Sequence, residues 1–146
     1  MTSFQPGRED YAEAVHALHA RTPLAKSMEV RLTSVAPGEV SAEMRLTTEV
    51  TQQHGVAHAG TIATLADIVC GLAAYSLMAE GVGVMSVNIN LSLLRPAEGE
   101  RLRAVGRVIK AGKRIYFTEA EVYAGDDAAE ALAARVSATM TSVRGA

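Results

Sequence analysis

The sequence is poor in several residue types that mark particular classes of protein. It has no tryptophan, two phenylalanines and a single cysteine, Cys70. One cysteine cannot form a disulfide within the chain, and this suits a protein of a reducing compartment. Residues 1–15 contain no apolar stretch of the kind that a secretory signal requires. We therefore expect a cytoplasmic protein.

Charge of one sign is not concentrated anywhere in the chain. There are 14 basic and 16 acidic residues among 146, which gives a formal net charge of −2. Nucleic-acid binding requires a clustered cationic face, and the sequence has no dense basic run to supply one. We therefore expect no nucleic-acid partner.

The longest apolar run covers residues 61–79 and has one ionisable side chain, Asp67. Its length suits a membrane span. The six Leu, Ile and Val residues of the run favour insertion by roughly 2 to 4 kcal/mol, and a central Asp opposes it by about 3 kcal/mol. The two contributions nearly cancel, and no second candidate span exists. We therefore expect a buried helix and no membrane partner.

Hydrophobic spacing predicts an α+β chain with one domain over residues 1–146. Residues 1–9 have no periodicity and are expected to be disordered, and helical spacing over 10–20 predicts a short helix with Asp10 as its N-cap. The disordered N-terminal segment and the short helix together occupy residues 1–25. Strand-like alternation then predicts a hairpin over 28–46 as the start of a core that extends to residue 143.

The long helix, 59–79, should be followed by four more strands with hairpin connections. We expect them at 84–94, 102–111, 115–123 and 130–143. The composition of the last segment favours a helix, but its alternation and the turn before it favour a strand. An antiparallel sheet packed on one apolar helix forms two layers, and a helix that is apolar on every side predicts a sheet that curls round it.

A seven-residue spacing places Gly60 and Asp67 on one face of the long helix, together with Thr64. The free N–H groups at the helix start, residues 58–61, can hold an oxyanion or polarise a carbonyl. A carboxylate two turns away can act on that carbonyl as a general base or as a nucleophile. The residues alone also allow another interpretation, in which Asp67 is a satisfied buried residue and the glycines only permit close packing.

Residues 58–67, HAGTIATLAD, resemble the HGG-x₄-L-x-D signature of the PaaI-type thioesterases, members of the hotdog-fold superfamily. The resemblance covers about residues 30–142, and residues 86–97 are similar to the family's first strand after the helix. It implies a hotdog fold, in which an antiparallel sheet of about six strands wraps round a long central helix. It also implies an acyl-CoA thioesterase that uses no cofactor.

The resemblance implies roles for individual residues. Asp67 matches the catalytic carboxylate, acting as general base or nucleophile. The helix start at Gly60 would polarise the thioester carbonyl, and Ala59 replaces the first Gly of the motif while keeping its N–H group. His58 would lie near the thioester. Ser86 falls where some members carry a serine that positions the attacking water.

Further residues are candidates for substrate contact. Gln52 stands six positions before the motif His, where several members carry an Asn or another polar residue. Thr64 shares the helix face of the carboxylate and is expected to contact substrate. Arg95, Lys113 and Arg114 lie near turns, where they are either grips for the phosphates of CoA or solvated surface charges.

The resemblance further implies a homodimer through the strand 84–94, or a homotetramer, with the active site at the dimer interface. Each Asp67 would then serve the helix start of its neighbour. A non-catalytic acyl-CoA-binding domain and a hotdog hydratase or dehydratase are the alternative functions. His54 and His58 are four residues apart but lack a third ligand, so no metal site is expected. Cys70 is expected to be a core thiol.

Overall fold

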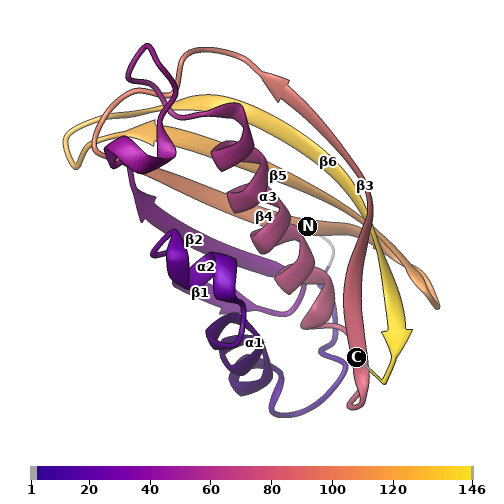
Figure 1. The fold of residues 1–146 in the computed structure, drawn as a ribbon. Helices are drawn as coiled ribbons and strands as arrows, with labels where there is room; N and C mark the ends of the chain where they lie inside the picture. The colour runs from indigo at the N-terminus through magenta and orange to yellow at the C-terminus, as the bar shows by residue number, and fades with distance from the viewer. Residues whose placement is uncertain (1–2, 146) are drawn as a thin grey trace.

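The structure is a computed structural model that describes residues 3–145 (Figure 1). Its helices and strands, in chain order, are α1 (Tyr11–Ala20), α2 (Pro23–Ser27), β1 (Arg31–Ala36), β2 (Glu39–Arg45), a 3-10 turn η1 (Thr48–Val50), α3 (Ala59–Tyr75), β3 (Val82–Leu93), β4 (Arg101–Ala111), β5 (Ile115–Gly125) and β6 (Glu130–Arg144). The last segment is therefore a strand, as its alternation predicted. The short helix α2 was not predicted.

Six antiparallel strands form one sheet in the order β1-β2-β4-β5-β6-β3, and α3 lies along its inner face (Figure 1). This is the predicted hotdog arrangement. Inward and outward residues alternate along the strands, as a sheet with one covered face requires. On β5, for example, Tyr116, Thr118 and Ala120 are buried, while Phe117 and Glu119 are exposed.

The predicted hairpin between the strand after α3 and the next strand is wrong. β3 pairs with β6, and β4 pairs with β2. The connection over 94–100 crosses the sheet near the start of α3, where Ala97 O accepts a hydrogen bond from Ala57 N and Glu100 O accepts one from Leu46 N. As a result, β3 is an edge strand with no strand partner on its outer side among the described residues.

Close contact between α3 and β4 depends on Gly106. A Cβ atom at this position would lie 2.5 Å from the backbone carbon of Val69 on α3. The absence of a side chain therefore lets the helix backbone approach the strand directly. This contact fixes the depth of α3 in the concave sheet.

The sheet covers α3 on one side only. Leu65 and Val69 face the sheet and are fully buried, while Gly60 is exposed and Asp67 and Gly71 are half-buried on the other side. The predicted sheet of six strands on a long central helix is present, and the helix side that carries Gly60, Asp67 and Gly71 is the side that the sheet leaves open. In the part of the chain that the structure describes, no helix has the length and hydropathy to span a membrane.

The N-terminal segment is ordered where the structure describes it, contrary to prediction. Residues 1–2 lie outside the described residues, but Phe4 packs on the core beside Gly38. Gly7 N donates a hydrogen bond to Ser76 O at 3.2 Å. Asp10 precedes α1 but makes no side-chain capping bond, because its carboxylate pairs with Arg8.

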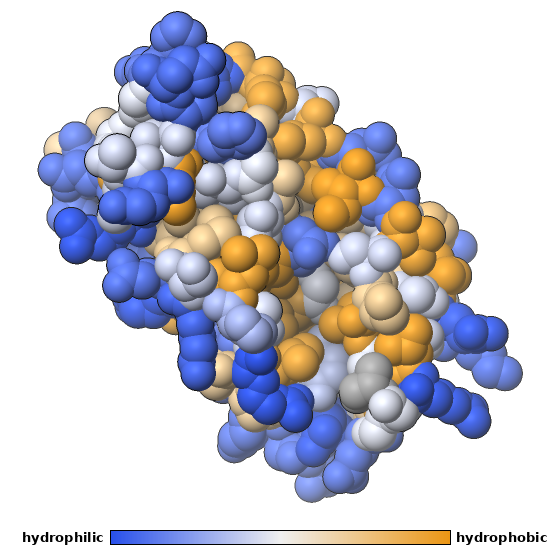
Figure 2. All heavy atoms as spheres, in the orientation of Figure 1, coloured by the Kyte–Doolittle hydropathy of each residue, from blue (hydrophilic) through white to orange (hydrophobic). Residues whose placement is uncertain are grey.

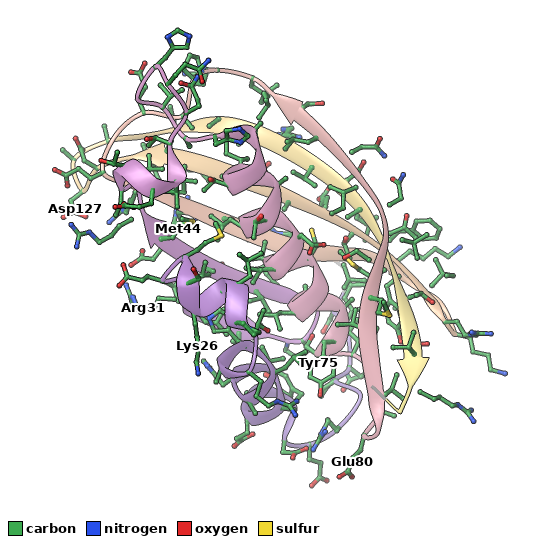
Figure 3. All side chains as sticks on the ribbon, viewed as in Figure 1. Lys26, Arg31, Met44, Tyr75, Glu80 and Asp127 are labelled. Atoms are coloured by element: carbon green, nitrogen blue, oxygen red, sulfur yellow. The ribbon has the colours of Figure 1, made fainter. Side chains whose placement is uncertain are left out.

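α3 ends at Tyr75, earlier than the predicted end at residue 79. The Ser76 hydroxyl accepts a hydrogen bond from Gly38 N at 2.8 Å and donates one to Ala73 O at 2.6 Å. This buried serine therefore satisfies backbone groups where the helix stops. Glu80 lies in the following turn, which leads to β3 (Figure 3).

Candidate active site

Asp67 and Ser86 contact each other directly. Asp67 is half-buried on α3, and its Oδ1 accepts a hydrogen bond from Ser86 Oγ on β3 at 2.5 Å. Ser86 Oγ also lies 3.3 Å from the sulfur of the buried Met140. Asp67 forms no ion pair with any described residue. The carboxylate thus has one hydroxyl partner and no cation, which leaves it able to accept a proton.

The start of α3 leaves one N–H group free, and it belongs to Ala59. His58 is the N-cap, and its Nδ1 accepts a hydrogen bond from Gly60 N at 2.8 Å. The carbonyl oxygen of His58 accepts bonds from Thr61 N and Ile62 N. Among the described residues, no acceptor engages Ala59 N. The available donor at this helix terminus is therefore Ala59, since capping occupies the N–H of Gly60.

Gln52 and Arg95 lie beside this helix start. They line a hollow of about 630 Å³ together with His58, Ala59 and Leu93. The side-chain oxygen of Gln52 accepts a hydrogen bond from the backbone N–H of His54, so this amide is folded into its own turn. The predicted residues Gln52, His58, Ala59 and Arg95 are thus gathered at one end of α3.

Thr64 lies on α3 between the residues at the helix start and the Asp67–Ser86 pair. Its hydroxyl donates a hydrogen bond to Gly60 O at 2.8 Å, one turn before it in the helix. Lys113 and Arg114 are farther away, in the β4–β5 turn. They line a separate hollow of about 820 Å³ with Leu77 and Met78, which follow the end of α3.

The predicted site residues therefore occupy three regions of one chain. Gln52, His58, Ala59 and Arg95 lie at the start of α3, Asp67 and Ser86 lie along its middle, and Lys113 and Arg114 lie past its end. Each of the three regions lines a hollow of its own.

Cys70 is buried in the core next to Gly106 and is unsuited to nucleophilic chemistry. Burial raises the pKa of its thiol to about 12, so the reactive thiolate is scarce at neutral pH. Within residues 3–145, no cluster of three or more His, Cys, Asp or Glu residues is arranged to hold a metal ion.

The structure adds contributors that the sequence did not indicate. Leu18 and His19, near the end of α1, and Thr22, which caps α2, line a cavity with Asp67 and Ser86. The helix itself was predicted, but periodicity does not tell which element a helix packs against. No motif marked these three residues.

The surface beside this site is hydrophobic along the edge strand. Figure 2 shows hydrophobic residues gathered on the β3 side of the molecule. Met85 and Val87 on β3 are 59% and 61% exposed. A long edge strand with exposed apolar side chains tends to pair with another strand.

A sequence model of the family described as thioesterase superfamily matches residues 54–131. The chain belongs to this superfamily. Among its relatives, acyl-coenzyme A thioesterase 13 of Homo sapiens is 35% identical and that of Mus musculus is 31% identical, each over 94 residues. These matches cover 64% of this chain and 66% of each relative, just under two thirds of its length.

Solved structures of other proteins share the fold. A thioesterase family protein from Silicibacter pomeroyi superposes with a TM-score of 0.90 at 37% identity, covering 92% of this chain and 99% of that one. The E. coli PaaI protein from the phenylacetic acid degradation operon superposes with a TM-score of 0.83 at 20% identity, covering 93% and 95%. The hotdog fold inferred from residues 58–67 is thereby confirmed.

Proposed function

We propose that this superfamily member hydrolyses an acyl-CoA thioester to a free acid and CoA, with Asp67 as the catalytic carboxylate. The observation that carries the proposal is the contact between Asp67 and Ser86 at a cavity. A carboxylate without a cation partner can take a proton from water, and the adjacent hydroxyl can hold that water in position. Membership of the thioesterase superfamily supports the reaction class.

The reaction needs a group that stabilises the developing oxyanion. The free N–H of Ala59, at the positive end of the α3 dipole, suits this role. The water oxygen attacks the carbonyl carbon while Asp67 accepts the water proton. The carbon–sulfur bond then breaks, and the departing CoA thiolate takes up the proton. Direct attack by the carboxylate is the other route, and it passes through an anhydride that water must cleave.

A second copy of the chain completes the site in this proposal. No strand of residues 3–145 pairs with the outer side of β3, so two copies can pair antiparallel along it about a two-fold axis. Antiparallel pairing brings the end of one β3 beside the beginning of the other. The start of α3 from one subunit then approaches the Asp67–Ser86 pair of its partner. The open side of α3 is covered by the same contact.

The same pairing suits the CoA moiety. Lys113 and Arg114 lie past the end of α3, so in an antiparallel pair they approach Arg95 at the start of the partner's helix. Three cations from two subunits would then be available for the phosphate groups. The proposal also includes assembly into a homodimer or a homotetramer and a cytoplasmic location for the protein.

The test is the Asp67→Asn variant, which preserves shape and removes the base. We expect kcat for acyl-CoA hydrolysis to fall about 10²- to 10⁴-fold, the usual contribution of a general base. Asp127→Asn is the matched control, since Asp127 is exposed on the opposite side of the molecule from β3 (Figure 3). An Asp67→Asn enzyme as fast as the parent would falsify the mechanism. A parent that binds acyl-CoA without releasing CoA indicates the non-catalytic alternative.

A further inference from the structure

Past the end of α3, a hollow of about 820 Å³ is lined by three cationic residues and, among the described residues, by no acidic one. Lys113 and Arg114 come from the β4–β5 turn, and Arg144 comes from the end of β6. The side chains of all three are exposed. The chain as a whole has a formal net charge of −2, so this hollow is a local concentration of positive charge on a slightly acidic protein.

Strand pairing places Arg114 and Arg144 on the concave face of the sheet, the face that carries Ser86. Ser86 lies opposite the buried Met140 of β6. Alternate residues of a strand point to the same side, so Met140, Ser142 and Arg144 share this face. Arg114 lies opposite Ser142, whose N–H donates a hydrogen bond to Arg114 O at 2.9 Å. The two arginines therefore lie near each other at one end of the concave face.

None of the three cations forms an ion pair with any described residue. On the outer face of the sheet, by contrast, Arg103, Arg107 and Arg135 each pair with a glutamate. The chain thus supplies counter-charges for the arginines of the outer face and none for the two at the concave face. Cations that share a hollow with apolar walls attract an anion, because such walls focus the electric field.

The hollow lies on the same face as the proposed catalytic pair and at a distance that suits CoA. Arg144 pairs with Val82, four residues before Ser86 on β3, so the backbones of Arg144 and Ser86 are about 14 Å apart by strand geometry. CoA carries its phosphate groups at the opposite end of the pantetheine arm from its sulfur atom. Leu77, Met78 and Val82 add apolar surface for an adenine ring, and the volume is typical of small-molecule sites.

We infer that this hollow binds the phosphorylated adenosine end of CoA and that Arg144 is a CoA-binding residue. The inference rests on the proposed thioesterase function and adds the group that recognises the carrier of the acyl chain. A phosphomonoester bears about two negative charges and three acceptor oxygens, so the 3′-phosphate of CoA suits a pair of guanidinium groups. Arg144 contributes to binding and takes no part in breaking the thioester.

The test compares an acyl-CoA with the same acyl group carried by dephospho-CoA and by pantetheine. For the parent, we expect KM to rise about tenfold when the 3′-phosphate is absent, the lower end of what a hydrogen bond to a charged group provides. Arg144→Gln should raise KM for the acyl-CoA to a similar extent, with kcat unchanged and with no effect on KM for the pantetheine thioester. Arg144→Lys keeps the charge and should retain most of the affinity.

Arg135→Gln is the matched control, because it removes the same charge from the outer face of the same strand. Its KM should equal that of the parent with all three thioesters.

A measurement on the unsubstituted protein makes the test independent of the variants. Adenosine 3′,5′-bisphosphate should inhibit acyl-CoA hydrolysis competitively and far more strongly than inorganic phosphate does. Added salt should weaken this inhibition, because it screens exposed charges.

The outcomes separate the two proposals. Equal KM values for the acyl-CoA and the pantetheine thioester in the parent, with no effect of Arg144→Gln, overturn the inference about the CoA-binding hollow and leave the thioesterase function intact. Inorganic phosphate that inhibits as strongly as the nucleotide shows a general anion site and also overturns the inference. A parent that hydrolyses none of the three thioesters overturns the proposed function instead.

Discussion

The Ser86 hydroxyl on β3 donates a hydrogen bond to the Asp67 carboxylate on α3, although the two residues are 19 positions apart in the chain. If this hydroxyl positions the attacking water, Ser86→Ala should lower kcat about 10- to 100-fold, as expected for a hydrogen bond to a charged group. Steady-state kinetics measures the change. Ser137→Ala, on the exposed face of β6, should behave as the parent. Parental kcat in Ser86→Ala would remove Ser86 from the mechanism.

The free N–H of Ala59 can be deleted with little effect on the helix. Ala59 is the first residue of α3, where proline is well tolerated. His58 before it has φ −64° and ψ 143°, which a following proline accepts. We expect Ala59→Pro to keep its melting temperature and to lose about 10²- to 10³-fold in kcat, because it removes an oxyanion donor. Ala59→Gly keeps the N–H group and should remain active, and full activity in Ala59→Pro would assign the donor elsewhere.

Mixing two inactive variants tests whether the site is shared between subunits. In a heterodimer of Asp67→Asn and Ala59→Pro chains, one of the two sites would combine an intact Asp67 with an intact Ala59 of the other chain. Random re-association of the two variants makes about half of the dimers mixed, and one of the two sites in each mixed dimer is intact. Mixing should therefore restore about a quarter of the parental activity. If each site uses residues of one chain only, mixing restores nothing.

The buried thiol of Cys70 should make stability depend on alkaline pH. Burial raises the pKa of the thiol from a usual value of 9.0 to about 12, so the folded state keeps a proton that the unfolded state releases. This contribution to stability is full below pH 9 and is lost as the pH rises to about 12. Urea unfolding should therefore show a steeper alkaline loss of stability for the parent than for Cys70→Ala. Identical pH slopes for the two proteins would contradict this assignment.

Local patterns were sufficient to predict most of the fold. Strict alternation identified β3, partial alternation and a preceding turn identified β6, and the apolar run identified α3. The neighbour of β3 was not predictable in the same way. Alternation tells which side of a strand is buried, but it does not tell whether β4 or β6 supplies the next hydrogen-bonded edge.

The site was predictable where a motif exists and not elsewhere. Residues 58–67 marked Asp67 and the helix start, but the motif did not reveal that the His58 ring occupies the N–H of Gly60 and leaves that of Ala59 free. This distinction depends on one side-chain rotamer, which spacing does not encode. His19 was missed because its contact with the cavity arises from how α1 packs, far from the motif in sequence.

The wall of the cavity formed by α1 lies outside residues 54–131, the segment that matches the superfamily model. In our proposal, the residues that break the thioester lie within that segment, whereas one wall of the adjoining cavity comes from a helix that precedes it. Selection can therefore alter α1 without disturbing the catalytic groups. Related chains with the same hydrolytic motif and a different N-terminal helix are thus free to acquire different substrates.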